Sequence, residues 1–136
     1  MRLHWEPLTR HNVLDVREQP AFASRCVECA TEASAALLSG ARLRTADVDL
    51  VVASQYPPTF PVELSCALGV PPERIPLAPP ALASAHTAGP MVALEAAIES
   101  GRFGEAGNVL FVTVGAGITT AVALYRSVPG RGRDPR

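Results

Sequence analysis

His86 is one of the few side chains in this sequence whose type and setting could do chemistry. It lies among small residues in the segment SAHTAG, so its imidazole would project into open space rather than be packed over. A helix is predicted to begin directly after it, and a helix N-terminus disfavours the protonated form of an imidazole. We therefore expect a neutral side chain that can act as a base or as a hydrogen-bond partner. The ordinary alternative is a polar residue that only precedes a helix.

Ser54 and a glycine-flanked turn are the other two candidates. Ser54 follows the apolar run DLVVA, at the strand end where functional side chains emerge in open α/β sheets. By pattern alone, a turn-forming serine before Gln-Tyr-Pro-Pro is the better interpretation. Gly115 and Gly117 join two apolar runs, and they allow positive φ and a close approach of the backbone to a ligand. A dinucleotide-binding motif is excluded, because Thr120 stands at the third glycine position and too few residues follow it.

The cysteines of the chain are not expected to form a metal or disulfide site. Cys26 and Cys29 lie on the apolar face of a predicted helix, and only Cys66 would add a further thiol to the four ligands that structural zinc needs. Buried free cysteines behave as small hydrophobic residues. We therefore expect core packing for Cys26 and Cys29, and no bound metal. His4 and His11 receive no role.

Apolar periodicity and helix breakers predict the elements that position these candidates. Helices are predicted between Pro20 and Gly40, over residues 61–68, and from residue 87 or 88 to Gly101. Buried strands are predicted over residues 49–53, 109–114 and 118–125, the last two forming a hairpin with both faces covered. Short strands are predicted over residues 2–5 and 13–16, and a proline-broken crossover over residues 75–85. This order predicts an α/β fold, with one domain over residues 1–126 and a disordered tail over residues 127–136.

Composition excludes several classes of function. The formal net charge of the 136 residues is −1, which argues against a general nucleic-acid binder. No apolar run reaches the roughly 18 residues of a membrane span, and the first residues have no apolar core of the signal-peptide type, so we expect a cytoplasmic protein without a membrane partner. Hydrophobic residues make up 48% of the chain but aromatic residues only 5%. This composition predicts close packing of helices on a sheet and an apolar interface with a partner.

Taken together, these segments resemble the C-terminal half of a thiolase-fold condensing enzyme of the 3-oxoacyl-(acyl-carrier-protein) synthase III type. The resemblance covers residues 22–126 and rests on the segments ADVDLVVASQ, ALGVPPERI, SAHTAGP and ESGRFGEAGNVLFVTVGAGITTAVALYR. It implies a thiolase-like half, with helices layered on a mixed five-stranded sheet. In that family the Gly-x-Gly turn of the hairpin lines the active site beside a nucleophilic cysteine, and Gly115 and Gly117 match it.

Two loops of this sequence depart from the family's pattern. The family places a histidine in a His-Gln-Ala-Asn loop, where this sequence has Ser54 and Gln55. It places an asparagine in a Gly-Asn-Thr-Ser loop, where this sequence has His86 and Thr87. Both family side chains donate hydrogen bonds to an oxygen on which charge develops. The resemblance implies that Ser54 and His86 hold this oxyanion, or that His86 is the general base for a hydroxyl, amine or thiol. Gln55 and Thr87 are further pocket candidates.

The resemblance leaves out the N-terminal half of the family, and neither Cys26, Cys29 nor Cys66 stands at the position of its nucleophile. One hypothesis is a split acyltransferase of fatty acid or polyketide biosynthesis, inactive alone, whose separate N-terminal half supplies the cysteine. The second is a non-catalytic subunit that stabilises or gates a full-length condensing enzyme, or binds an acyl carrier protein. A third is one domain of a longer protein. We expect a dimer or other homo- or hetero-oligomer, no cofactor, and an acyl thioester of carrier protein or coenzyme A as substrate.

Overall fold

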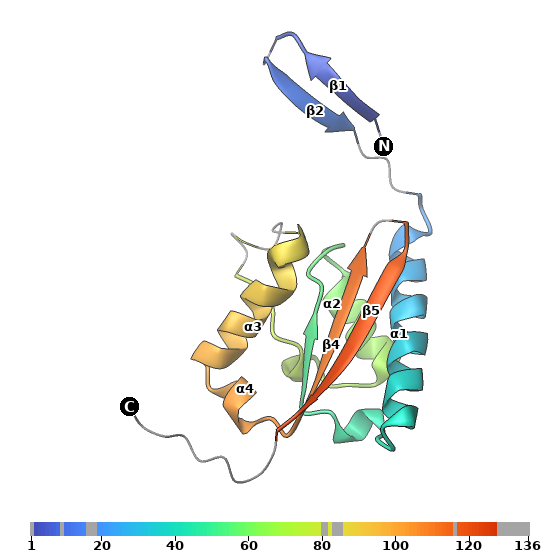
Figure 1. Cartoon of the computed structure of the whole chain (residues 1–136), viewed down its shortest axis with the longest axis vertical. Helices are drawn as coiled ribbons and strands as arrows, with labels where there is room; N and C mark the ends of the chain where they lie inside the picture. Colours follow the sequence, from blue (N-terminus) through green and yellow to red (C-terminus); the bar gives the residue numbers. More distant parts are fainter. Residues whose placement is uncertain are drawn as a thin grey trace.

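A three-stranded sheet lies between two pairs of helices in the computed structural model of this chain (Figure 1). The structure describes residues 2–8, 10–15, 19–79, 82, 86–115 and 117–127. The helices and strands follow in the order β1 (Arg2–Glu6), β2 (His11–Asp15), α1 (Phe22–Gly40), β3 (Leu50–Ala53), α2 (Phe60–Leu68), α3 (Gly89–Glu99), α4 (Arg102–Glu105), β4 (Asn108–Gly115) and β5 (Thr119–Arg126). Short 3-10 turns are formed by η1 (Thr45–Asp47), η2 (Pro72–Arg74) and η4 (His86–Ala88). The predicted α/β layering is confirmed.

The sheet has the order β3-β4-β5. Strands β3 and β4 are parallel, with Ala53 opposite Val112, whereas β4 and β5 are antiparallel and form the predicted hairpin. The first two strands pair with each other in a separate two-stranded sheet, which Figure 1 shows apart from the central one. Five strands are therefore present among the described residues, but they are divided between two sheets rather than joined in one.

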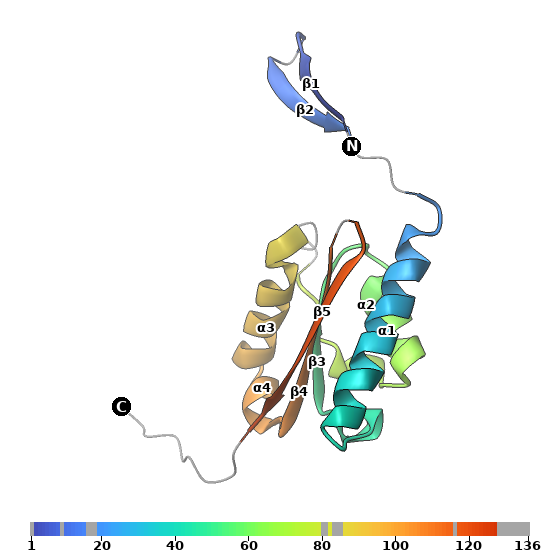
Figure 2. The same ribbon diagram turned by 45° about the vertical axis from the view of Figure 1, so that its right-hand side comes forward.

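Helices α1 and α2 cover one face of the sheet, and α3 and α4 lie on the other (Figure 2). The two faces have separate cores because successive strand residues point to opposite sides. The larger core, under α1 and α2, contains Val51, Leu110, Val112, Phe60, Leu64 and Cys26. The smaller core, under α3 and α4, contains Leu50, Val52, Val109, Ala97 and Ala106. Cys26 is therefore core, as predicted, and all four residues of β3 are buried.

The prediction that both faces of the hairpin are covered is wrong for β5. Its residues alternate between partly buried and exposed along the strand. The side chains of Val122 and Leu124 pack against the core under α1, while Ala121 and Ala123 on the opposite face are exposed. Because α3 packs on β3 rather than on β5, no described helix covers these two alanines.

Glycine marks the end of α2 as the sequence indicates. Gly69 has a φ of +65°, a left-handed conformation that costs other residues energy, and the buried Ser65 hydroxyl donates to the carbonyl of Val70 beyond it at 2.7 Å. Within the described residues, no helix is long and apolar enough to span a membrane. Residues 128–136 of the predicted tail lie outside the described residues, and Ser127 still donates its N–H to the carbonyl of Gly107 at 2.8 Å.

Candidate functional site

The carboxyl end of β3 places Ser54 beside the hairpin. The N–H of Ser54 donates to the carbonyl of Val112 at 2.9 Å, as a further residue of the strand would. The next ladder bond is made by a side chain, because the N–H of Val114 donates to Ser54 Oγ at 3.0 Å. Ser54 is only 5% exposed. The Ser54 hydroxyl oxygen thus accepts the hydrogen bond from Val114, the residue before Gly115, that a backbone carbonyl of a longer β3 would accept.

The neighbouring Gln55 points to the other edge of β3. It is also 5% exposed, and its amide is used within the protein. Gln55 Nε2 donates to the carbonyl of Ala53 at 2.9 Å and, over a longer 3.5 Å, to that of Pro76. Gln55 Oε1 accepts from the N–H of Ala78 at 3.0 Å. The amide of Gln55, which was predicted from the sequence as a pocket candidate, is therefore hydrogen-bonded to the segment that follows η2.

The start of α3 approaches the same strand end. Gly89, its first residue, is buried, and a Cβ there would lie 3.1 Å from the Cβ and Cγ atoms of Gln55. The preceding turn η4 contains His86 and Thr87. Thr87 is exposed, whereas the side chain of His86 lies outside what the structure describes. The backbone of His86 is thus only three residues from a tight contact with Gln55.

The hairpin turn completes this edge of the sheet. Gly115 ends β4 opposite Thr119, and Gly117 has a φ of +79°. Ile118 also has a positive φ, of 41°, so the turn uses left-handed conformations at two successive residues, as tight hairpin turns do. The left-handed conformation that the sequence predicts for these glycines is therefore found at Gly117, whereas Gly115 ends β4 without a positive φ.

The structure brings three of the predicted segments together at one end of the sheet, beyond the carboxyl end of β3. Ser54 contacts β4 just before the glycine turn, and Gln55 contacts the first residue of α3. Both contacts involve buried polar side chains that are bonded inside the protein, which the pattern of the sequence does not reveal. Among the described residues, no group of three or more histidine, cysteine and acidic side chains could hold a metal ion.

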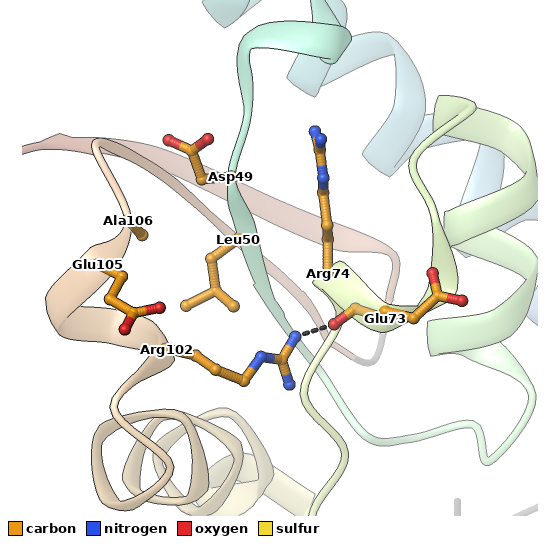
Figure 3. Close-up of a pocket in the computed structure, with 7 residues that line it drawn as sticks. All are labelled: Asp49, Leu50, Glu73, Arg74, Arg102, Glu105 and Ala106. Carbon is orange, nitrogen blue, oxygen red and sulfur yellow. Dashed lines mark hydrogen bonds between the residues drawn. The ribbon is translucent and has the colours of Figure 1, made fainter.

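A second feature, which the sequence did not predict, is a hollow of about 270 Å³ at the opposite end of β3 (Figure 3). It is lined by Asp49, Leu50, Glu73, Arg74, Arg102, Glu105 and Ala106. Asp49 directly precedes β3 and Leu50 begins it, whereas Ser54 and Gln55 follow the strand, so the hollow lies away from the predicted site residues.

The charged groups of this hollow hold chain segments together. Arg74 Nη1 donates to the carbonyls of Val48 at 2.6 Å and Ala46 at 3.2 Å. Arg102 Nη2 donates to the carbonyl of Glu73, which Figure 3 shows as a dashed line. These bonds join segments that are distant in sequence, which explains why no local motif predicted them.

One carboxyl group near this end has a shifted pKa. The backbone N–H of Arg44 donates to Asp47 Oδ2 at 2.8 Å, and its guanidinium lies 3.4 Å from Oδ1. The backbone hydrogen bond first, and the guanidinium second, lower the pKa of Asp47 below its usual value of about 3.8. The group is at the surface and stabilises η1 rather than a site.

Comparison with known proteins supports the same assignment of the fold. The sequence profile of the family described as 3-oxoacyl-[acyl-carrier-protein (ACP)] synthase III C terminal matches residues 38–127. The crystal structure of 3-oxoacyl-[acyl-carrier-protein] synthase III from Aquifex aeolicus VF5 is 21% identical with a TM-score of 0.71, covering 92% of this chain and 39% of that one. The corresponding structure from Thermus thermophilus is 25% identical with a TM-score of 0.70, covering 85% of this chain and 36% of that one.

A solved structure of lower sequence identity has a similar fold. PKS-I from the brown alga Ectocarpus siliculosus is 13% identical with a TM-score of 0.65, covering 93% of this chain and 35% of that one. The chain therefore spans about two-fifths or less of the length of these solved structures. A search of curated proteins found no significant match.

Proposed function

Since this chain belongs to the C-terminal family of 3-oxoacyl-[acyl-carrier-protein] synthase III, we propose that it is one half of an acyltransferase acting on acyl thioesters. In this proposal a separate N-terminal half supplies the nucleophilic cysteine, and the chain is inactive alone. The observation that carries the proposal is the meeting of Ser54, the β4–β5 turn and the start of α3 at one edge of the sheet. The substrate is an acyl thioester of a carrier protein or of coenzyme A, with no further cofactor.

The roles of the site residues follow from their bonding capacity. A hydroxyl that accepts one hydrogen bond can still donate its own proton, so Ser54 can donate to a thioester oxygen while it accepts from Val114. Donation from a buried hydroxyl is stronger than in water because the surroundings have a low dielectric constant. A neutral His86 would serve as the second donor or as the base for an incoming hydroxyl, amine or thiol. The backbone at Gly115 and Gly117 lines the acyl pocket.

The test uses the chain together with the protein that co-purifies with it. The reconstituted pair is incubated with acyl-coenzyme A or with acyl carrier protein, and covalent loading is measured by mass spectrometry. We expect an acyl adduct on a cysteine of the partner and a loss of turnover in His86→Ala. An unloaded partner, together with full turnover of His86→Ala, would refute the proposal.

A second function is favoured by one specific observation. Ser54 and Gln55 are both buried and both bonded to other parts of the chain, as expected of residues that stabilise a strand end. We therefore also consider a non-catalytic subunit that stabilises or gates a full-length condensing enzyme, or binds an acyl carrier protein. In that case His86→Ala leaves the activity of the partner intact, whereas substitutions at the interface abolish it.

A further inference from the structure

The hydrogen-bond ladder of β3 continues past the end of its backbone strand. The prolines at 57 and 58 cannot donate ladder bonds, and β3 ends at Ala53. Toward β4, the Ser54 hydroxyl accepts the bond that a strand carbonyl would accept. Toward residues 76–78, the Gln55 amide makes the contacts. Side chains thus replace the backbone on both edges of the strand.

The contacts of the Gln55 amide follow the pattern of a parallel β-bridge. In such a bridge, one residue donates to the carbonyl before its opposite neighbour and accepts from the N–H after it. Gln55 Nε2 donates to Pro76 and Gln55 Oε1 accepts from Ala78, so the residue bridged is Leu77. A glutamine side chain carries the same N–H and C=O groups as a peptide, which a carboxylate or a methionine does not. Only an amide of this length fulfils both roles.

The opposite side of Gln55 supports the start of α3. The would-be Cβ of Gly89 is 3.1 Å from two side-chain carbons of Gln55 and 3.4 Å from its backbone nitrogen. Gly89 follows η4 directly, and η4 begins with His86. A shift of the Gln55 side chain must therefore move either residues 76–78 or the helix that follows His86.

We infer that Gln55 is a positioning residue, which fixes the turn carrying His86 and Thr87 against the strand end carrying Ser54. The importance of this geometry for acyl transfer rests on the proposed function, but the positioning itself does not. Gln55 acts through its amide on Ala78 and through its carbon chain on Gly89. It does not contact substrate in this assignment, because its amide is buried and bonded inside the protein.

The test is made on the full chain by NMR, without a partner or turnover. Gln55→Met keeps the length and volume of the side chain but removes its donor and acceptor. Ser65→Ala is the matched control, because it removes another buried side-chain hydrogen bond, at 2.7 Å to Val70, away from the end of β3. The readouts are amide hydrogen exchange at Ala78 and the ring resonances and titration midpoint of His86. His86 is assigned by comparison with variants of the other two histidines.

We expect amide exchange at Ala78 to accelerate about tenfold or more in Gln55→Met, and the His86 resonances and midpoint to move. Ser65→Ala should leave both readouts unchanged at a comparable loss of Tm. If Gln55→Met does not fold, Gly89→Ala presses on the same contact and should move the His86 resonances. His86 resonances that move no more than in Ser65→Ala would overturn the inference. This result is distinguishable from failure of the proposed function, which is measured by acyl loading and by turnover of His86→Ala in the reconstituted pair.

Discussion

Gly89→Ala should destabilise this protein although alanine is the better helix former. Replacing glycine by alanine in a helix stabilises by about 0.5–1 kcal/mol, from helix propensity and the smaller entropy of the unfolded chain. At Gly89, however, the added Cβ would lie 3.1 Å from Gln55 Cβ and 3.4 Å from its backbone nitrogen. Overpacking of this kind costs about 1–3 kcal/mol. We therefore expect a net loss of about 1 kcal/mol.

Gly40→Ala provides the matched control. Gly40 is the last residue of α1, also in a helix, and nothing lies within 4 Å of the position of its Cβ. Here only the favourable contribution remains, so we expect a gain of about 0.5–1 kcal/mol. Urea unfolding followed by far-UV circular dichroism measures both variants against the parent chain. The difference in unfolding free energy between them should be about 2 kcal/mol.

Two results would refute this reasoning. If Gly89→Ala stabilises the chain as much as Gly40→Ala does, the contact between α3 and Gln55 is not tight. If both variants destabilise it, the gain from helix propensity has been overestimated at both positions, and the clash cannot be isolated. An unchanged slope of free energy against urea concentration confirms that each variant alters stability rather than the extent of unfolding.

Four further substitutions test individual side chains. Within the described part of the chain, the Oγ1 atoms of Thr31 and Thr120 are buried without a hydrogen-bond partner, so valine at either position should raise the unfolding free energy by about 1 kcal/mol in urea titrations. Arg74→Met keeps the aliphatic stem but removes the bonds to the carbonyls of Val48 and Ala46, and the same titration should show a loss of about 1–2 kcal/mol. Because the pKa of Asp47 is lowered on folding, its ionised carboxylate stabilises the fold above about pH 3.8, and this stabilisation is lost as the pH falls through the lowered pKa. Asp47→Asn should therefore reduce Tm at neutral pH, and should reduce it by less at about pH 2.

Local patterns predicted the elements whose signals lie within a short window of sequence. The helix after Pro20 and the β4–β5 hairpin follow from apolar periodicity, and Gly69 ends α2 in the left-handed conformation typical of such glycines. The helix α4 was not predicted, since it has only four residues. It is stabilised from a distance: Phe103 stacks on the ring of Tyr125 with centroids 5.5 Å apart, and Ala106 is buried after it.

The candidate site could be predicted only in part, because its contacts join residues that are distant in the sequence. Ser54 was recognised as a side chain at a strand end, but its bond to Val114 joins residues 60 positions apart. Gln55 was included as a pocket candidate, whereas its partners Ala78 and Gly89 are 23 and 34 positions away, and no local pattern links them. The one sequence signal that another segment packs closely on α3 was Gly89 at its first position, because most other residues form helices better than glycine does.

Under the proposed function, the hydrogen bonding of Ser54 limits the chemical roles that this chain could have in acyl transfer. A neutral imidazole at this position would offer both an acceptor and a donor, so it could act as a base. The Ser54 oxygen already accepts from the N–H of Val114, and a hydroxyl is too weakly basic to take up a proton, so toward a substrate oxygen Ser54 can only donate. Under the proposed function, base chemistry would therefore fall to His86, and Ser54 would stabilise an oxyanion. The non-catalytic alternative needs only the bond to Val114. The two functions thus differ in whether the Ser54 proton is used, not in where Ser54 lies.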